Sequence, residues 1–333
     1  MKNGLYIYGI IAASGAQDFG NIGIGNEATP VQTIAFQDVA AVVSRSPFMV
    51  YDTLAKDTIV KDLVTHQFVL EKVMQMFTVI PVKFGTMVET DDEVTRFLSK
   101  GYPLLSAELS KQAAKIELDV VANWELSNIL PTIYRHNEQV QKKQSAIAQQ
   151  GKAVSVAERV ELGKLIEQAL TTTKAEYQQL ITQTLQEITL EICLHDMADE
   201  HMIFNGAFLL EKKNAQRFNQ LIDDLDRKLE NTINFRIVGP LPAYSFATIV
   251  LEQIDPAQVE KAREILGLPG QLTSKNVRDA YHQLAQKYHP DKSSSEESAQ
   301  FPQINAAYRT LKKFMENGLL YVGIYRWEKD STV

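Results

Sequence analysis

The chain has 333 residues, of which 45% are hydrophobic and 23% are charged. This length predicts two or three domains, and the composition excludes a wholly disordered chain. The net charge of −7 is uneven, because residues 256–333 hold 11 basic and 9 acidic side chains (+2), which leaves −9 on the remainder. An acidic body argues against a nucleic-acid partner, since phosphate binding needs clustered cations.

The sequence also shows no sign of a membrane-spanning segment or of a disulfide framework. No apolar run approaches the ~20 residues that a membrane-spanning helix needs, so we expect no membrane partner. Cys193 is the single cysteine, which excludes an internal disulfide and a cysteine-rich zinc site. The reducing cytoplasm is therefore the expected compartment.

The first 110 residues mix strand and helix patterns. Runs rich in β-branched and aromatic residues predict strands over 5–10, 31–36, 39–44 and 79–85. Apolar residues at helical spacing predict a helix over 58–77. The acidic residues Asp91 and Asp92 are suited to the N-terminus of another helix. We expect an N-terminal α+β domain over 1–110.

A second α+β domain is expected over 111–255. Strand patterns occur at 116–125, 201–210, 235–239 and 245–251. Pro131 suits the first turn of a helix, and an apolar stripe from Leu162 to Ile192 predicts a long helix. That helix is long enough to pair with a neighbour as a helical hairpin or short coiled coil. An amphipathic helix is expected over 214–230.

Residues 256–314 are helical in pattern throughout. Asp255 and Pro256 suit the N-cap and first turn of one helix. A second helix runs from about Thr273 to Tyr288, and a third begins near Phe301. Between them stands Tyr-His-Pro-Asp-Lys, in which Pro290 ends the second helix and leaves its neighbours at the tip of an antiparallel hairpin.

This segment resembles the J-domain of the DnaJ co-chaperone family. The second helix reads VRDAYHQLAQKYHPDK (277–292) and the third reads FPQINAAYRTLKKF (301–314), and their apolar positions match the family core. The resemblance implies an all-α J-domain over 256–316 that binds a DnaK-type chaperone. It assigns chaperone binding to His289, Pro290, Asp291, Arg278, Lys287, Lys292 and Tyr281. His282 and Gln283 stand where the family usually places basic residues.

The body resembles the gas vesicle protein F/L family. The runs VIPVKFGTMVETDDEV (79–94) and FRIVGPLPAYSF (235–246) are similar to two motifs of that family, and YIYGI (6–10), AAVVS (40–44) and AFLLEK (207–212) follow the same order. The resemblance covers most of residues 1–255. It implies an α+β fold class, with two α+β domains (ferredoxin-like variants) linked by a long helical, coiled-coil-like segment.

The loops inside the two body motifs have two interpretations. Gly85 suits a positive-φ turn after Phe84, and Gly239 to Pro242 form a stiff loop. Aromatic side chains beside such turns are usually packed in a core, which is the structural interpretation. The functional interpretation is a docking surface for the shell protein. Its candidate residues are Phe84, Gly85, Pro240, Pro242, Tyr244 and Phe246.

Several chemical signals favour structural explanations. The run Gly23 to Ala28 matches a dinucleotide-binding fingerprint, but Pro30 and a strand pattern follow where a helix should begin. His195 and His201 lie six residues apart, which does not fit a helical metal pair. His66 is interpreted as a core or boundary histidine, and Cys193 as a small core residue. We expect no catalytic residues, metal or cofactor, and therefore no enzyme.

The last segment, 317–333, differs from a J-domain. Its run GLLYVGIYRW (318–327) alternates like a strand and is too apolar to remain in water. We expect it to return to the body and pair with a sheet edge, or to bind the shell directly. If it pairs with the body, the J-domain is an insertion between the body and this tail.

Together the two resemblances imply a cytoplasmic gas vesicle assembly protein. It would bind the major shell protein and recruit a DnaK-type chaperone through the J-domain, and other gas vesicle accessory proteins are further expected partners. One alternative is a general J-domain co-chaperone whose α+β body binds clients. Another is a minor structural gas vesicle component with a degenerate J-domain.

Overall fold

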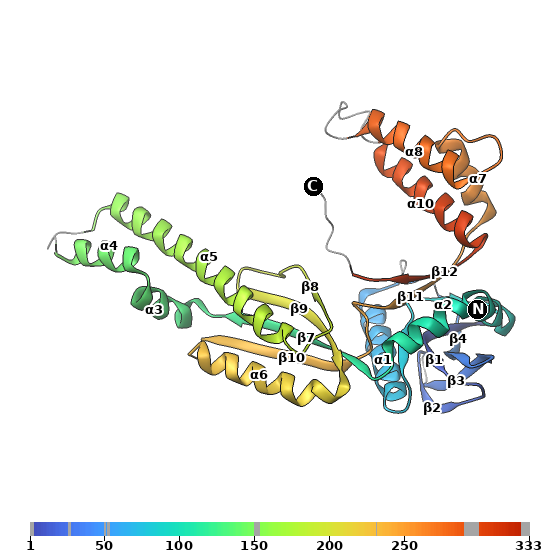
Figure 1. Ribbon diagram of the computed structural model, residues 1–333, viewed down its shortest axis with the longest axis horizontal. Helices are drawn as coiled ribbons and strands as arrows, with labels where there is room; N and C mark the ends of the chain where they lie inside the picture. Colours follow the sequence, from blue (N-terminus) through green and yellow to red (C-terminus); the bar gives the residue numbers. More distant parts are fainter. Residues whose placement is uncertain are drawn as a thin grey trace. The chain divides into compact units, whose positions relative to one another are not determined.

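The computed structural model describes residues 3–25, 28–49, 51, 54–149, 154–230, 232–289 and 300–327 (Figure 1). These residues form two compact units. The first unit is made of Met1–Lys111 and Ala247–Tyr325, and the second of Gln112–Phe246 and Arg326–Val333. The strand expected over 245–251 was placed in the second domain, whereas the strand observed there, Thr248–Gln253, belongs to the first unit.

A six-stranded antiparallel sheet forms the centre of the first unit. Its strands are β1 (Asn3–Ala12), β2 (Asp18–Gly23), β3 (Thr29–Phe36), β4 (Val39–Pro47), β5 (Val79–Pro81) and β6 (Met87–Val88). The strand order is β2-β3-β4-β1-β5, and β6 also pairs with β1. Residues 4–11 of β1 are all buried, which explains why this central strand reads as one apolar run.

Two helices accompany this sheet, α1 (Lys56–Met74) and α2 (Asp91–Gln112). The buried residues of α1 are Asp62, His66, Val69, Leu70 and Val73, and the helix contacts β1, β2 and β5. Asp91, Asp92 and Glu93 lie in the first turn of α2, as the sequence predicted. There their carboxylates face the positive end of the helix dipole.

Three helices, α7 (Pro256–Ile265), α8 (Ser274–Tyr288) and α10 (Phe301–Asn317), pack as one bundle in the first unit. They lie in the chain between two paired strands, β11 (Thr248–Gln253) and β12 (Leu320–Tyr325). The predicted strand in the last segment is therefore present. Ile249 of β11 also forms a parallel bridge with Val82, the residue directly after β5. Val322 of β12 leaves no room for a side chain at Gly101 of α2.

The second unit is built on a four-stranded antiparallel sheet with the order β10-β7-β9-β8. The strands are β7 (Lys115–Trp124), β8 (Glu191–Leu194), β9 (Met202–Glu211) and β10 (Ile233–Leu241). The amphipathic helix α6 (Ala215–Lys228) follows a short 3-10 turn, η2 (Lys212–Asn214), and lies along the sheet (Figure 1). Its buried residues are Phe218, Leu221, Ile222 and Leu225.

Three more helices connect β7 to β8, namely α3 (Leu126–His136), α4 (Glu138–Gln149) and α5 (Val156–Gln186). α5 begins at a capping box formed by Ser155 and Glu158, and it packs against both α3 and α4. The expectations of ferredoxin-like variants and of a coiled coil stay predictions. The prediction that Pro131 starts a helix is wrong, because Pro131 lies inside α3.

Candidate functional site

The hairpin of α8 and α10 is fixed by caps and by aromatic contacts. Thr273 and Asn276 form a reciprocal capping box at the start of α8. The rings of Tyr281 and Tyr308 stack with their centroids 4.2 Å apart, and the Tyr281 hydroxyl donates to Asn305 Oδ1 at 2.7 Å. Tyr281 thus holds the two helices together. Its assignment to chaperone binding stays a prediction.

The tip of the hairpin begins at His289. This residue is the C-cap of α8 and has an extended backbone, φ −63° and ψ 134°, which is the conformation favoured before a proline. Its ring meets Phe301 at the start of α10 with centroids 5.4 Å apart. The other expected tip residues, Pro290, Asp291 and Lys292, lie outside the described residues.

The solvent-facing side of α8 carries cations near both ends. Arg278 and Lys287 are exposed, and Lys287 Nζ lies 4.9 Å from the centre of the Tyr288 ring. His282 and Gln283 are exposed between them. The arrangement presents positive charge beside the tip, interrupted by two side chains without a permanent charge. Binding of a chaperone by these residues stays a prediction.

Phe84 and Gly85 belong to an aromatic corner of the first unit. The Gly85 N–H donates to the hydroxyl of Tyr6 at 3.0 Å, and the same hydroxyl lies 2.9 Å from Nδ1 of His66. The half-buried Phe84 ring packs against Tyr51 with centroids 4.8 Å apart. Gly85 has φ +82°, which favours glycine over any residue with a side chain.

The Tyr6 hydroxyl and Nδ1 of His66 share one hydrogen bond at 2.9 Å, and the imidazole tautomer decides which of the two atoms donates. His66 is buried, and burial lowers its pKa to about 4. The prediction of a core histidine is confirmed. Its Nε2 has no hydrogen-bond partner among the described residues.

The second body motif covers the end of β10, where the pairing with β7 is irregular between Val238 and Leu241, and the loop that follows it in the second unit. A cis peptide joins Gly239 to Pro240, whose ring is exposed. Pro242 and Phe246 are buried, and Tyr244 is half-buried. The six shell-binding candidates thus fall into two groups, one on each unit. Contact with a shell protein stays a prediction for all of them.

Sequence reasoning missed a buried polar cluster behind this loop. Glu117 of β7 is 1% exposed and accepts hydrogen bonds from the backbone N–H and the hydroxyl of Ser245, both at 2.9 Å. Burial, and next the neighbouring Asp119 carboxyl, raise the pKa of Glu117 to about 8. The available signal was the strand IELDVV, in which two carboxylates alternate with apolar residues.

The same loop holds the segment that follows β12. The backbone N–H of Trp327 donates to the backbone carbonyl of Ser245 at 2.8 Å, and Arg326 Nε donates to the backbone carbonyl of Phe246 at 2.9 Å. The Trp327 ring lies 5.0 Å from that of His195, whose Nε2 is 3.3 Å from the Ser245 hydroxyl. The carboxyl of Glu117 bonds the serine rather than the histidine. This differs from a nucleophile-activating triad, in which the acid orients the histidine.

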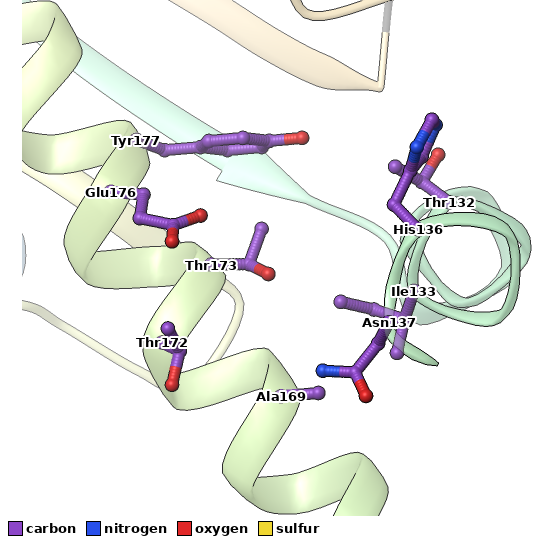
Figure 2. A pocket seen from close by; sticks show the side chains of 9 residues that line it. All are labelled: Thr132, Ile133, His136, Asn137, Ala169, Thr172, Thr173, Glu176 and Tyr177. Atoms are coloured by element: carbon purple, nitrogen blue, oxygen red, sulfur yellow. The ribbon is translucent and has the colours of Figure 1, made fainter. Parts of the chain in front are cut away.

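A cleft of about 310 Å³ lies between α3 and α5 of the second unit (Figure 2). It is lined by Thr132, Ile133, His136, Asn137, Ala169, Thr172, Thr173, Glu176 and Tyr177. Sequence reasoning did not predict it, because its residues come from two helices about 35 positions apart.

Other chemical groupings are absent from the part of the chain that the structure describes. No cluster of three or more potential metal ligands occurs there, including the stretch from His195 to His201. No described helix is long and apolar enough to cross a membrane. Of the dinucleotide-like run, Asn26 and Glu27 lie outside the described residues.

Two family models match the sequence. The model of the gas vesicle synthesis protein GvpL/GvpF family matches residues 4–248, and that of the DnaJ domain matches residues 263–315. The fold and the hairpin thus define a mixed α/β body with a C-terminal J-domain. The first match covers most of the chain, so the protein belongs to the GvpL/GvpF family. Both resemblances drawn from the sequence are confirmed.

Curated relatives divide in the same way. Gas vesicle protein F of Nostoc sp. strain PCC 7120 is 26% identical over 253 residues, which cover 75% of this chain and 100% of that protein. Gas vesicle protein F of Microcystis aeruginosa strain PCC 7806 gives the same identity and coverage. Human DnaJ homolog subfamily B member 9 is 36% identical over 74 residues, or 22% of this chain and 33% of that protein.

Two solved structures resemble the body. The crystal structure of GvpF from Anabaena sp. PCC7120 has a TM-score of 0.58 and 25% identity, covering 73% of this chain and 97% of that chain. GvpF from Microcystis aeruginosa has a TM-score of 0.53 and 22% identity, covering 73% and 98% respectively. This second likeness supports the fold alone.

Proposed function

We propose that the protein is a gas vesicle accessory protein that binds the major shell protein and recruits a DnaK-type chaperone to it. It acts at gas vesicles in the cytoplasm, together with other accessory proteins, and it acts by binding rather than by catalysis. The hydrophobic subunits of the shell need protection from aggregation before assembly, and a chaperone recruited by the J-domain supplies that protection.

The observation that carries this proposal is the double connection of the J-domain to the body. The J-domain lies between β11 and β12, which pair with each other from Thr248–Tyr325 to Gln253–Leu320. Ile254, directly after β11, is part of the J-domain core. Lys313 of α10 also forms an ion pair with Glu252 of β11 and lies 4.9 Å from the ring centre of Tyr321 in β12.

Such an attachment keeps the chaperone close to whatever the body binds. A partner held by one module reaches an effective concentration of about millimolar at a neighbouring module, even through a flexible linker. Two paired strands restrict the J-domain more than a single tether does. A client bound to the body is therefore presented repeatedly to the recruited chaperone.

The proposed contacts are His289, Arg278 and Lys287 on the J-domain, together with the tip residues that follow His289. On the body, the accessible candidates are Pro240, which is exposed, and Phe84, Gly85 and Tyr244, which are half-buried. Pro242 and Phe246 are buried and support the shape of the second loop rather than its surface.

A pull-down from vesicle-forming cells tests the proposal with His289→Gln as the variant. We expect the wild-type chain to retain both the shell protein and the chaperone, and the variant to lose only the chaperone. His282→Gln is the matched control, because it also replaces an exposed histidine of the same hairpin but lies outside the tip. Absence of the shell protein from the wild-type sample would contradict the assignment of the body.

A second candidate is a minor structural vesicle component whose J-domain no longer stimulates a chaperone. His282 and Gln283, which carry no permanent charge on the exposed face of α8, favour this function. Purified chain added to a DnaK-type ATPase distinguishes the two. Stimulation that His289→Gln abolishes supports the first proposal. No stimulation by wild type, with stimulation by His282→Arg/Gln283→Arg, supports the second.

A general J-domain co-chaperone is the third possibility to separate. Such a protein binds unrelated unfolded proteins through its body. Competition between the shell protein and a reduced, unfolded model client makes the distinction. Equal binding of both by the wild-type chain would favour the general co-chaperone.

A further inference from the structure

The cleft between α3 and α5 has an apolar floor and a polar rim. Ile133 and Ala169 at the floor are 3% and 4% exposed. Around them, the side chains of Glu176, Tyr177 and Thr173 from α5 face those of His136 and Asn137 across the gap (Figure 2). A volume of about 310 Å³ is enough for one long side chain or a small ligand.

The lining has one negative charge and no permanent positive charge. Glu176 is the only charged side chain among the lining residues when histidine is counted as neutral. Its carboxylate is exposed and forms no hydrogen bond or ion pair with any other residue that the structure describes. A carboxylate left unpaired beside an apolar floor complements a cation that carries an apolar stem.

Tyr177 lies beside the Glu176 carboxylate in this cleft. Burial raises the pKa of its hydroxyl, and the charges of Glu230 and Glu176 raise it further. Glu230 is already paired with Arg135 at 3.0 Å, so the unpaired negative charge at this side of the cleft is that of Glu176. The Tyr177 ring also offers a face on which a planar cation can stack, an arrangement that arginine uses more often than lysine does.

We propose that this cleft binds an arginine side chain presented by a partner protein. The methylene stem of the arginine lies on Ile133 and Ala169, the guanidinium stacks on Tyr177, and its N–H groups donate to the Glu176 carboxylate. The threonine hydroxyls of the lining accept further hydrogen bonds. This site does not depend on the function proposed above, because it uses neither the J-domain nor the two loop motifs.

The probe is the peptide acetyl-Gly-Arg-Gly-amide, titrated into the full chain. Its control is the same peptide with citrulline, which keeps the shape of arginine but has no charge. Trp124 provides the signal, because its ring lies 6.4 Å from that of Tyr177. Trp327→Phe removes the fluorescence of Trp327, which contacts His195 away from the cleft. A lone side chain should bind at roughly millimolar Kd.

We expect saturable binding of the arginine peptide, several-fold tighter than that of the citrulline peptide. Glu176→Gln should weaken the arginine peptide by about threefold, the scale of an exposed ion pair. Tyr177→Leu should weaken it by a similar factor through loss of the stacking face. Glu167→Gln, which removes another exposed carboxylate of α5 outside the cleft, should leave binding unchanged.

Three results would overturn the proposal. Equal affinity for the arginine and citrulline peptides would indicate a neutral polar ligand instead. Equal weakening by Glu176→Gln and Glu167→Gln would indicate attraction to the whole acidic surface rather than to this cleft. No saturation up to tens of millimolar would mean that the cleft does not bind arginine. Unchanged circular dichroism of Glu176→Gln and of Tyr177→Leu excludes misfolding as a cause.

Discussion

The two loop motifs of the body are each anchored by one buried polar side chain, but the anchors are chemically different. In the first unit, the hydroxyl of Tyr6 accepts the Gly85 N–H and bonds to His66. In the second unit, the carboxyl of Glu117 accepts two hydrogen bonds from Ser245. A phenol and an imidazole thus hold one corner, and a carboxyl holds the other.

Burial drives both corners to the uncharged state from opposite directions. Desolvation disfavours a charge, so it raises the pKa of an acid and lowers that of a base. Accordingly, the pKa of His66 falls to about 4, and that of Glu117 rises to about 8. Two loops that look alike in sequence, with aromatic residues beside a glycine or proline turn, therefore respond to pH in opposite ways.

The largest expected effect breaks the second anchor. Glu117→Ala leaves the backbone N–H of Ser245 without an acceptor in a buried place, at a cost of about 1–3 kcal/mol, and leaves the Ser245 hydroxyl only its contact of 3.3 Å with His195 Nε2. We expect the second unit to lose about 2–5 kcal/mol of unfolding free energy. Urea unfolding measures the total, and hydrogen exchange in β7 and β9 localises the loss.

Glu117→Gln is the matched variant for that experiment. Its amide oxygen still accepts from Ser245, and its amide group donates where a protonated carboxyl would, so the loss should be smaller than for alanine. If the two variants were equally unstable, the volume or shape of the side chain would matter more than the hydrogen bonds. Equal stability of Glu117→Ala and wild type would remove the anchor role altogether.

The second prediction concerns the opposite pH responses. His66 has a folded pKa of about 4 against an ordinary 6.5, so the unfolded state binds more protons between these values. The first unit should therefore lose stability as the pH falls from 6.5 to 4, by on the order of 3 kcal/mol. Glu117 has a folded pKa of about 8 against 4.5, so the second unit should lose stability as the pH rises through that window.

Hydrogen exchange, corrected for the intrinsic effect of pH, follows β1 and β7 separately. His66→Gln should remove the loss of stability at low pH in β1 only. Glu117→Gln should remove the loss of stability at high pH in β7 only. Asp119, whose pKa is raised by burial to about 6, adds a contribution of the same sign as Glu117. Slopes of the same sign in both strands would contradict the comparison.

Some elements of the fold were predictable from the sequence and others were not. The apolar run of β1 and the amphipathic pattern of α6 predicted their elements correctly, because one residue pattern decides each of them. The stripe from Leu162 to Ile192 was extended too far. α5 ends at Gln186, and Ile192 lies in the strand β8. The spacing of three or four residues that marks a helical stripe can continue into a strand that follows the helix, as it does at Ile192. β-branched residues such as isoleucine favour the strand there.

The candidate sites also differ in whether their residues are close together or far apart in the sequence. The paired helices α8 and α10 were predictable, because each helix is one contiguous amphipathic segment. The Glu117 cluster was not, since its bond to Ser245 joins residues 128 positions apart. The prediction that Pro131 starts a helix was wrong because packing, rather than this one residue, decides where α3 begins. Proline favours the first helical turn, yet burial of Ile129 and Ile133 places the start of α3 five residues earlier.

The smallest expected effect tests the first anchor. Tyr6→Phe keeps the ring and its contacts with Tyr8 and Phe84 but removes the hydroxyl, so the Gly85 N–H loses its acceptor and His66 Nδ1 loses its hydrogen-bond partner. We expect a loss of about 2 kcal/mol, measured by urea unfolding. Tyr102→Phe is the control, because its hydroxyl bonds to Asp38 at the surface, where water replaces the lost partner. Equal losses in the two variants would mean that the buried hydroxyl of Tyr6 stabilises the corner no more than an exposed one does. A larger loss in Tyr6→Phe alone, with the loss of stability at high pH in β7 unchanged, would show that the two anchors act independently.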